Sequence, residues 1–186
     1  MITKQMLLSA LILGATANIA LGMEQEYRKK QQEEINREFL LAAFTGKLKK
    51  IKRLLYFDNA DVNAKGKYGE TALHNAASMH ITNMFNVKNE NKITIAEELI
   101  KNGANINARS SNGSTPTHCA AYRCDRSMLE FFVKNGADLT LENNAGKTPS
   151  MAVTEEKEYW NDGTCQDAYN FFKEYESAKS ALLKKY

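Results

Sequence analysis

The 186-residue sequence predicts an all-α solenoid of about four helix-turn-helix units, preceded by a signal peptide. Three observations support this prediction. A nine-residue block recurs at offsets of 44 and then 33 residues, apolar side chains near it follow helical spacing, and glycine follows the last apolar residue of these runs. Because one such unit cannot bury its own apolar face, three or more units must stack.

Residues 1–22 have the pattern of a secretory signal peptide. Lys4 precedes an apolar stretch over residues 6–15, and small residues allow cleavage before Met23. The apolar stretch is shorter than the roughly 20 residues that span a bilayer. We therefore expect cleavage and export to a periplasmic or secreted location. The alternative is a membrane anchor formed by residues 6–21, and only this alternative involves a membrane.

The rest of the chain divides into a charged lead-in, a repeat domain and a C-terminal tail. The lead-in over residues 23–35 mixes both charges and has almost no apolar stripe, so it is either a solvated helix or a disordered segment. The repeat domain is expected over 36–176 and the tail over 177–186. The repeat units are expected at about residues 36–66, 67–110, 111–143 and 144–176.

The recurring block identifies a repeat family. It reads GETALHNAA from Gly69, GSTPTHCAA from Gly113 and GKTPSMAVT from Gly146, while a second block reads NGANINAR from Asn102 and NGADLTLE from Asn135. These two blocks, in register, resemble the ankyrin repeat. The resemblance implies units of a turn and two antiparallel helices, and a non-catalytic module for protein–protein interaction.

Helical spacing and end signals agree with this interpretation. The run GKLKKIKRLL places Leu48, Ile51 and Leu54 on one stripe, which is typical of an amphipathic helix. Two later runs end at Gly103 and Gly136, where glycine accepts the left-handed conformation that stops a helix. At the helix starts, a Thr can cap backbone donors while a His three residues later folds back to the turn. These structural pairs are Thr71 with His74 and Thr115 with His118.

Several positions depart from the repeat pattern. Thr117 replaces a leucine and removes apolar volume, and Cys124 replaces the glycine that ends an inner helix, so that this turn either holds a positive φ or changes shape. Residues 80–92 contain four asparagines and are expected to form an inserted loop. The last unit, 144–176, is degenerate and is expected to cap the array.

Composition excludes several classes of function. A formal net charge of +3 is far from that of a dedicated nucleic-acid binder, and neither cofactor, metal nor small-molecule substrate is expected. His118 and Cys119 are sequence neighbours, so their side chains diverge on a helix and do not form a nucleophile and base.

The three cysteines are either all unpaired, or two of them form a bridge between adjacent units, Cys124 to Cys165.

The family resemblance implies that a partner protein binds to the concave face, which turn tips and inner helices form. Because Tyr and Arg often dominate interface energies, Tyr68, Tyr122 and Arg123 are the expected anchors. A competing hypothesis assigns binding of anionic polymers to the basic run over residues 47–53. The full set of expected partner-binding residues is Lys67, Tyr68, Glu70, Ser78, Met79, Ser111, Asn112, Ser114, Tyr122, Arg123, Lys147, Glu155 and Glu156.

Overall fold

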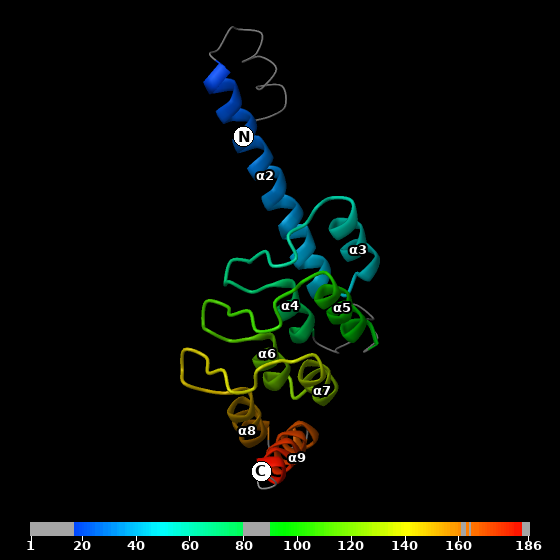
Figure 1. Cartoon of the computed structure of the whole chain (residues 1–186), viewed down its shortest axis with the longest axis vertical. Helices are drawn as coiled ribbons and strands as arrows, with labels where there is room; N and C mark the ends of the chain where they lie inside the picture. The colour runs from blue at the N-terminus through cyan, green and yellow to red at the C-terminus, as the bar shows by residue number, and fades with distance from the viewer. Residues whose placement is uncertain (1–16, 80–89, 161–162, 164, 184–186) are drawn as a thin grey trace.

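The computed structural model describes residues 17–79, 90–160, 163 and 165–183, and the regular secondary structure of these residues consists of helices alone. The signal peptide predicted over residues 1–22 lies mostly outside the described residues. Figure 1 shows an elongated array in which the first and last described helices lie at opposite ends. The helices are α2 (Ala17–Phe44), α3 (Leu48–Tyr56), α4 (Ala72–Ser78), α5 (Glu90–Lys101), α6 (Pro116–Tyr122), α7 (Arg126–Lys134), α8 (Pro149–Trp160) and α9 (Gln166–Leu183).

The helices form two rows. α2, α4, α6 and α8 contact one another in sequence as an inner row, and each packs against its own outer helix, α3, α5, α7 or α9. The long connections that precede α4, α6 and α8 project to the same side of the array (Figure 1). This arrangement confirms the predicted all-α solenoid of helix pairs.

Small residues let the inner helices approach one another closely. Consecutive alanines are buried in three inner helices, at Ala42–Ala43, Ala76–Ala77 and Ala120–Ala121, and α8 buries Ala152 and Val153. Such residues allow helix axes to lie about 8 to 10 Å apart. The outer helices supply larger side chains to the same continuous core: Ile51, Leu54, Ile95, Leu99, Leu129, Phe132 and Phe172.

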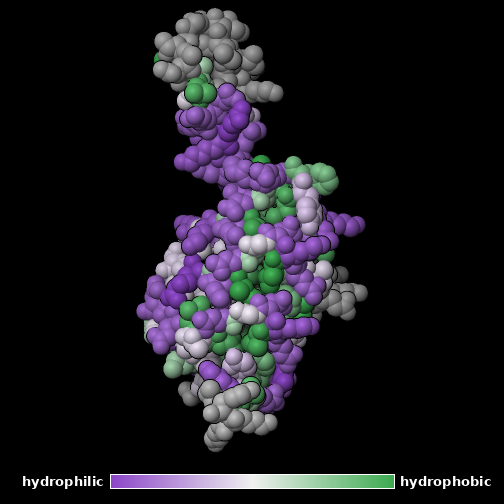
Figure 2. Space-filling view, viewed as in Figure 1, coloured by the Kyte–Doolittle hydropathy of each residue, from purple (hydrophilic) through white to green (hydrophobic). Residues whose placement is uncertain are grey.

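The charged lead-in is helical. Residues 23–35 belong to α2, which continues without interruption into the first inner helix and ends at Phe44. Its exposed face carries ion pairs four residues apart, Arg28 with Glu24 and Lys30 with Glu26, which support a polar helix. Figure 2 accordingly shows a hydrophilic surface on the part of α2 that projects from the array. In the part of the chain that the structure describes, no helix has both the length and the apolar character needed to cross a membrane.

The helices of the structure run past two of the expected boundaries. The inserted loop was expected over residues 80–92, whereas α5 begins at Glu90, so that Lys92 lies within this helix and pairs with Asp125. Residues 80–89 of that loop lie outside the described residues. The C-terminal tail was placed over residues 177–186, but α9 extends to Leu183, because Ala, Lys and Leu in that segment are good helix formers.

A disulfide joins Cys124 to Cys165, with a Cα–Cα distance of 4.9 Å. It ties the turn between α6 and α7 to the residue that precedes α9, so the last helix pair is covalently attached to the third. Cys124 has a φ of +52°, which means that it keeps the left-handed turn that a glycine would otherwise make. Cys119 is a free cysteine.

Candidate functional site

The turns before α4, α6 and α8 share one backbone geometry. In each turn, a backbone N–H donates to the carbonyl four residues later: Gly66 to Glu70 at 2.8 Å, Ser110 to Ser114 at 3.0 Å, and Asn143 to Lys147 at 2.9 Å. A glycine with a φ between +71° and +75° occupies the same place in all three turns, at Gly69, Gly113 and Gly146. The three turns therefore present their side chains in a repeated register.

Hydrogen bonds stack the turns on one another. The Ser111 N–H donates to the Tyr68 carbonyl at 2.8 Å, and the Asn144 N–H donates to the Asn112 carbonyl at 2.9 Å. The amide of Asn144 adds a bond to the Ser111 carbonyl at 3.0 Å. The turn tips consequently form one continuous row, whose members these hydrogen bonds hold in place.

Buried histidines connect each inner helix to the following turn. Nε2 of His74 lies 2.9 Å from the Ser114 carbonyl, and Nε2 of His118 lies 2.8 Å from the Lys147 carbonyl. Since a carbonyl only accepts, each Nε2 carries the proton. The Nδ1 atoms accept from the backbone N–H groups of Thr71 at 3.1 Å and Thr115 at 3.2 Å. Through these contacts, each Thr and His pair joins the start of its helix to the following turn.

Burial also sets the protonation of these histidines. Both rings are almost completely inaccessible to solvent, with relative exposures of 2% for His74 and 0% for His118. Removal from water disfavours the charged imidazolium and lowers the pKa of each ring below its ordinary value, although the carbonyl at Nε2 acts in the opposite direction. The neutral rings serve as fixed connectors between helix and turn.

Several residues predicted to bind a partner form the exposed tips. Tyr68 is 68% exposed, and the Lys67 ammonium group lies 5.5 Å from the centre of its ring. The Glu70 carboxylate accepts from the Tyr68 N–H at 2.8 Å and so fixes this tip. Ser111 and Asn112 are exposed on the next turn. The structure thus brings the tips of two turns together in one surface.

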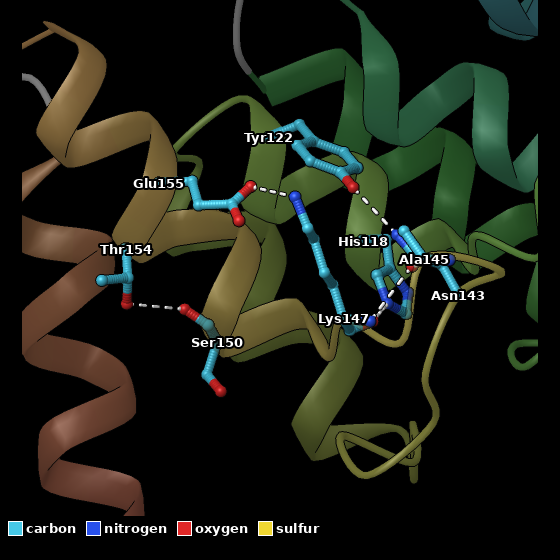
Figure 3. A network of polar contacts seen from close by, with 8 residues as sticks. All are labelled: His118, Tyr122, Asn143, Ala145, Lys147, Ser150, Thr154 and Glu155. Atoms are coloured by element: carbon cyan, nitrogen blue, oxygen red, sulfur yellow. Dashed lines mark hydrogen bonds and ion pairs between the residues drawn. The ribbon is translucent and has the colours of Figure 1, made fainter.

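The third turn meets the inner helices at Tyr122. The Tyr122 hydroxyl accepts from the Asn143 side-chain amide at 3.0 Å, and the Lys147 ammonium group pairs with Glu155 at 2.7 Å (Figure 3). Tyr122 is half-buried, so part of its ring supports the turn. Arg123, the next residue, is exposed.

Two of the predicted partner-binding residues do not belong to this surface. Ser114 is 3% exposed because it leads directly into the capped start of α6, where His74 holds its carbonyl. Met79 is 7% exposed because it turns into the core at the end of α4. Ser78 and Glu156, also predicted, are half-buried and offer only part of their side chains.

Sequence reasoning missed an open groove at the N-terminal end of the array. Its volume is about 840 Å³, and it lies between α2 and the turn before α4. Leu41 is 57% exposed and Phe44 is 50% exposed, and both line it. The sequence contains a signal for this groove. All six residues from Phe39 to Phe44 are apolar, and a helix turns only one face toward the core, so some of these side chains must be exposed.

The described residues contain no cluster of three or more His, Cys, Asp and Glu side chains that could hold a metal ion. Burial raises the pKa of the Cys119 thiol, which disfavours the nucleophilic thiolate. The rings of His74 and His118 are engaged with backbone groups at both nitrogens. His80 lies outside the described residues.

The paired helices, the row of stacked turns and the Thr and His connectors define a solenoid repeat protein. A family model described as "Ankyrin repeats (many copies)" matches residues 39–86 and 87–133. The chain belongs to the ankyrin repeat family. Proteins of this family are generally modules for protein–protein interaction and are typically non-catalytic. Comparison with curated proteins gives no match to this chain.

Proposed function

We propose that this chain is an exported, non-catalytic protein that binds a partner protein on the concave face formed by its turn tips and inner helices. The row of hydrogen-bonded turns is the observation that supports this proposal most directly. Its tips present Tyr68, and Arg123 directly follows the inner helix α6; both residues are exposed. Surfaces that are rigid before binding lose less conformational entropy when a partner docks.

Export is supported by two independent features. The first 22 residues have the pattern of a signal peptide, and a disulfide joins Cys124 to Cys165. Disulfides persist mainly in oxidising compartments such as the periplasm or the extracellular space. The mature chain would then begin near Met23. The intact mass of the exported protein tests this point, and a mass that retains Met1 would favour the membrane-anchored alternative, in which residues 6–21 hold the protein at a membrane.

The basic run over residues 47–53 does not favour binding of anionic polymers. Three of its basic side chains are already paired with carboxylates, each at 3.0 Å: Lys50 with Glu38, Lys52 with Glu98, and Arg53 with Asp58. A nucleic-acid or polyanion site would instead need several cations free for phosphate or sulfate groups. We therefore assign this run to the outer surface of a structural helix.

The proposal is tested by identifying the partner and then altering the surface. Chemical cross-linking of the exported protein, followed by mass spectrometry, supplies the partner. We then expect Tyr68→Ala combined with Arg123→Ala to weaken its binding about ten-fold or more in calorimetric titration, because residues of these types often dominate interfaces. The control is Phe57→Ala, at an 84% exposed aromatic residue that follows α3. Equal affinities for both variants and the unmodified chain would contradict the proposal.

A further inference from the structure

The second and third turns each donate two kinds of hydrogen bond to the turn before them. Near the base, the Asn105 N–H donates to Asn63 Oδ1 at 2.8 Å, and the Asp138 N–H donates to Asn107 Oδ1 at 3.0 Å. The first turn has the corresponding bond, because its Asp61 N–H donates to Asn36 Oδ1 at 3.0 Å. Since Asn36 belongs to α2, this helix replaces a preceding turn at the base.

At the tip, the first turn lacks the corresponding neighbour. The donors in the later turns are the N–H groups of Ser111 and Asn144, which bond to the preceding turn. The equivalent residue in the first turn is Lys67, 44 positions before Ser111. Among the described residues, the Lys67 N–H has no hydrogen-bond partner. α2 remains helical where a preceding turn would lie, so the stacking edge stays open at Lys67.

The groove occupies the space beside this open edge. Its lining includes Lys67 in the turn and Leu41 and Phe44 on α2. When the buried alanine pairs of α2 and α4 are aligned, Leu41 corresponds to Asn75 and Phe44 corresponds to Ser78. The first inner helix therefore places two exposed apolar side chains where the second has polar ones. An apolar floor beside an unpaired backbone donor suits an extended chain that carries an apolar side chain.

We propose that this groove binds an extended peptide segment of a partner protein. A backbone carbonyl of the peptide accepts from the Lys67 N–H, which continues the row of stacked turns by one member, and an apolar side chain of the peptide packs on Leu41 and Phe44. The proposal rests on the proposed protein-binding function and assigns a partner chemistry to its N-terminal end. Charge does not select the peptide, because the groove has equal numbers of acidic and basic residues: Glu33, Asp61, Glu70, Arg37, Lys65 and Lys67.

The probe is a phage-displayed library of twelve-residue linear peptides, selected on the purified full chain. A selected peptide is synthesised and titrated into the chain, and amide hydrogen exchange is followed by NMR. We expect the Lys67 amide to exchange at least several-fold more slowly in the complex. We also expect Leu41→Asn and Phe44→Ser to weaken binding ten-fold or more. Both variants carry the residue found at the equivalent place in α4, and circular dichroism checks that each remains folded.

The matched control is Phe57→Ser, which removes an exposed aromatic residue that does not line the groove and should leave binding unchanged. The inference is overturned if the Lys67 amide exchanges equally fast with and without the peptide, or if no selected peptide is sensitive to Phe44→Ser. A peptide that is sensitive only to Arg123→Ala would overturn the groove assignment while supporting the proposed function. Self-association of the chain that Phe44→Ser abolishes would assign the groove to a second copy and would also overturn the inference.

Discussion

The ammonium group of Lys92 contacts the carboxylate of Asp125, and this ion pair joins the first turn of α5 to the residue that precedes α7. Both side chains are nearly inaccessible to solvent, with exposures of 5% and 9%. Asp125 has a second role, because its Oδ1 accepts from the Met128 N–H at 3.2 Å and caps α7. The pair therefore fixes the C-terminal end of the inserted segment against the next unit.

Removing one member of this pair should destabilise the array strongly. Lys92→Ala leaves the Asp125 carboxylate buried without its counter-charge, and such a change lowers the free energy of unfolding by about 3–5 kcal/mol. Urea denaturation followed by circular dichroism measures the loss. Lys101→Ala, at an exposed position in the last turn of α5, is the control and should change the free energy by less than about 0.5 kcal/mol. Equal effects at both positions would show that the pair contributes nothing.

Removing the buried hydroxyl of Thr117 should instead raise the free energy of unfolding. Thr117 is 0% exposed, and its Oγ1 has no hydrogen-bond partner among the described residues. Thr117→Val keeps nearly the same shape and removes the unpaired polar group, so we expect the free energy of unfolding to rise by about 1 kcal/mol. The matched control is Thr115→Val, which removes a helix cap and should lower it by about 1 kcal/mol. A loss of stability in both variants would contradict this account of Thr117.

The disulfide should stabilise the last unit. Cys124 and Cys165 are separated by 41 residues in sequence, and removing a native disulfide typically lowers the free energy of unfolding by about 2–5 kcal/mol. We expect this loss in Cys124→Ala combined with Cys165→Ala. Cys124→Gly combined with Cys165→Ala should lose roughly 1 kcal/mol less, because glycine adopts the positive φ of position 124 without strain. Thiol titration of the unfolded chain should give one thiol before reduction and three after it.

The repeat pattern predicted the parts of the fold that depend on local sequence. Threonine and histidine three residues apart predicted the connectors at Thr71 and Thr115, because a capping interaction needs only neighbouring residues. The apolar run from Phe39 to Phe44 indicates that some of its side chains are exposed, but the groove beside Phe44 also depends on the absence of a preceding turn, which that run does not encode. The burial of Lys92 likewise depends on Asp125 in the next unit. Contacts between units were therefore the least predictable part of both the fold and the candidate site.

The buried histidines make stability depend on pH in a defined range. The pKa values of His74 and His118 are lowered below the ordinary value of 6.5, so the unfolded chain binds protons before the folded chain does. Stability is therefore fully present above pH 6.5 and falls as the pH drops below it, by at most about 1.4 kcal/mol per pH unit for each histidine. Urea denaturation between pH 5.0 and 7.5 measures this slope while remaining above the range in which most carboxylates titrate.

His118→Gln should lower stability at pH 7.5, because the contacts with Thr115 and Lys147 are altered, and should also flatten the slope between pH 6.5 and 5.0. A slope that stays unchanged in His118→Gln would show that this ring already titrates normally in the folded chain.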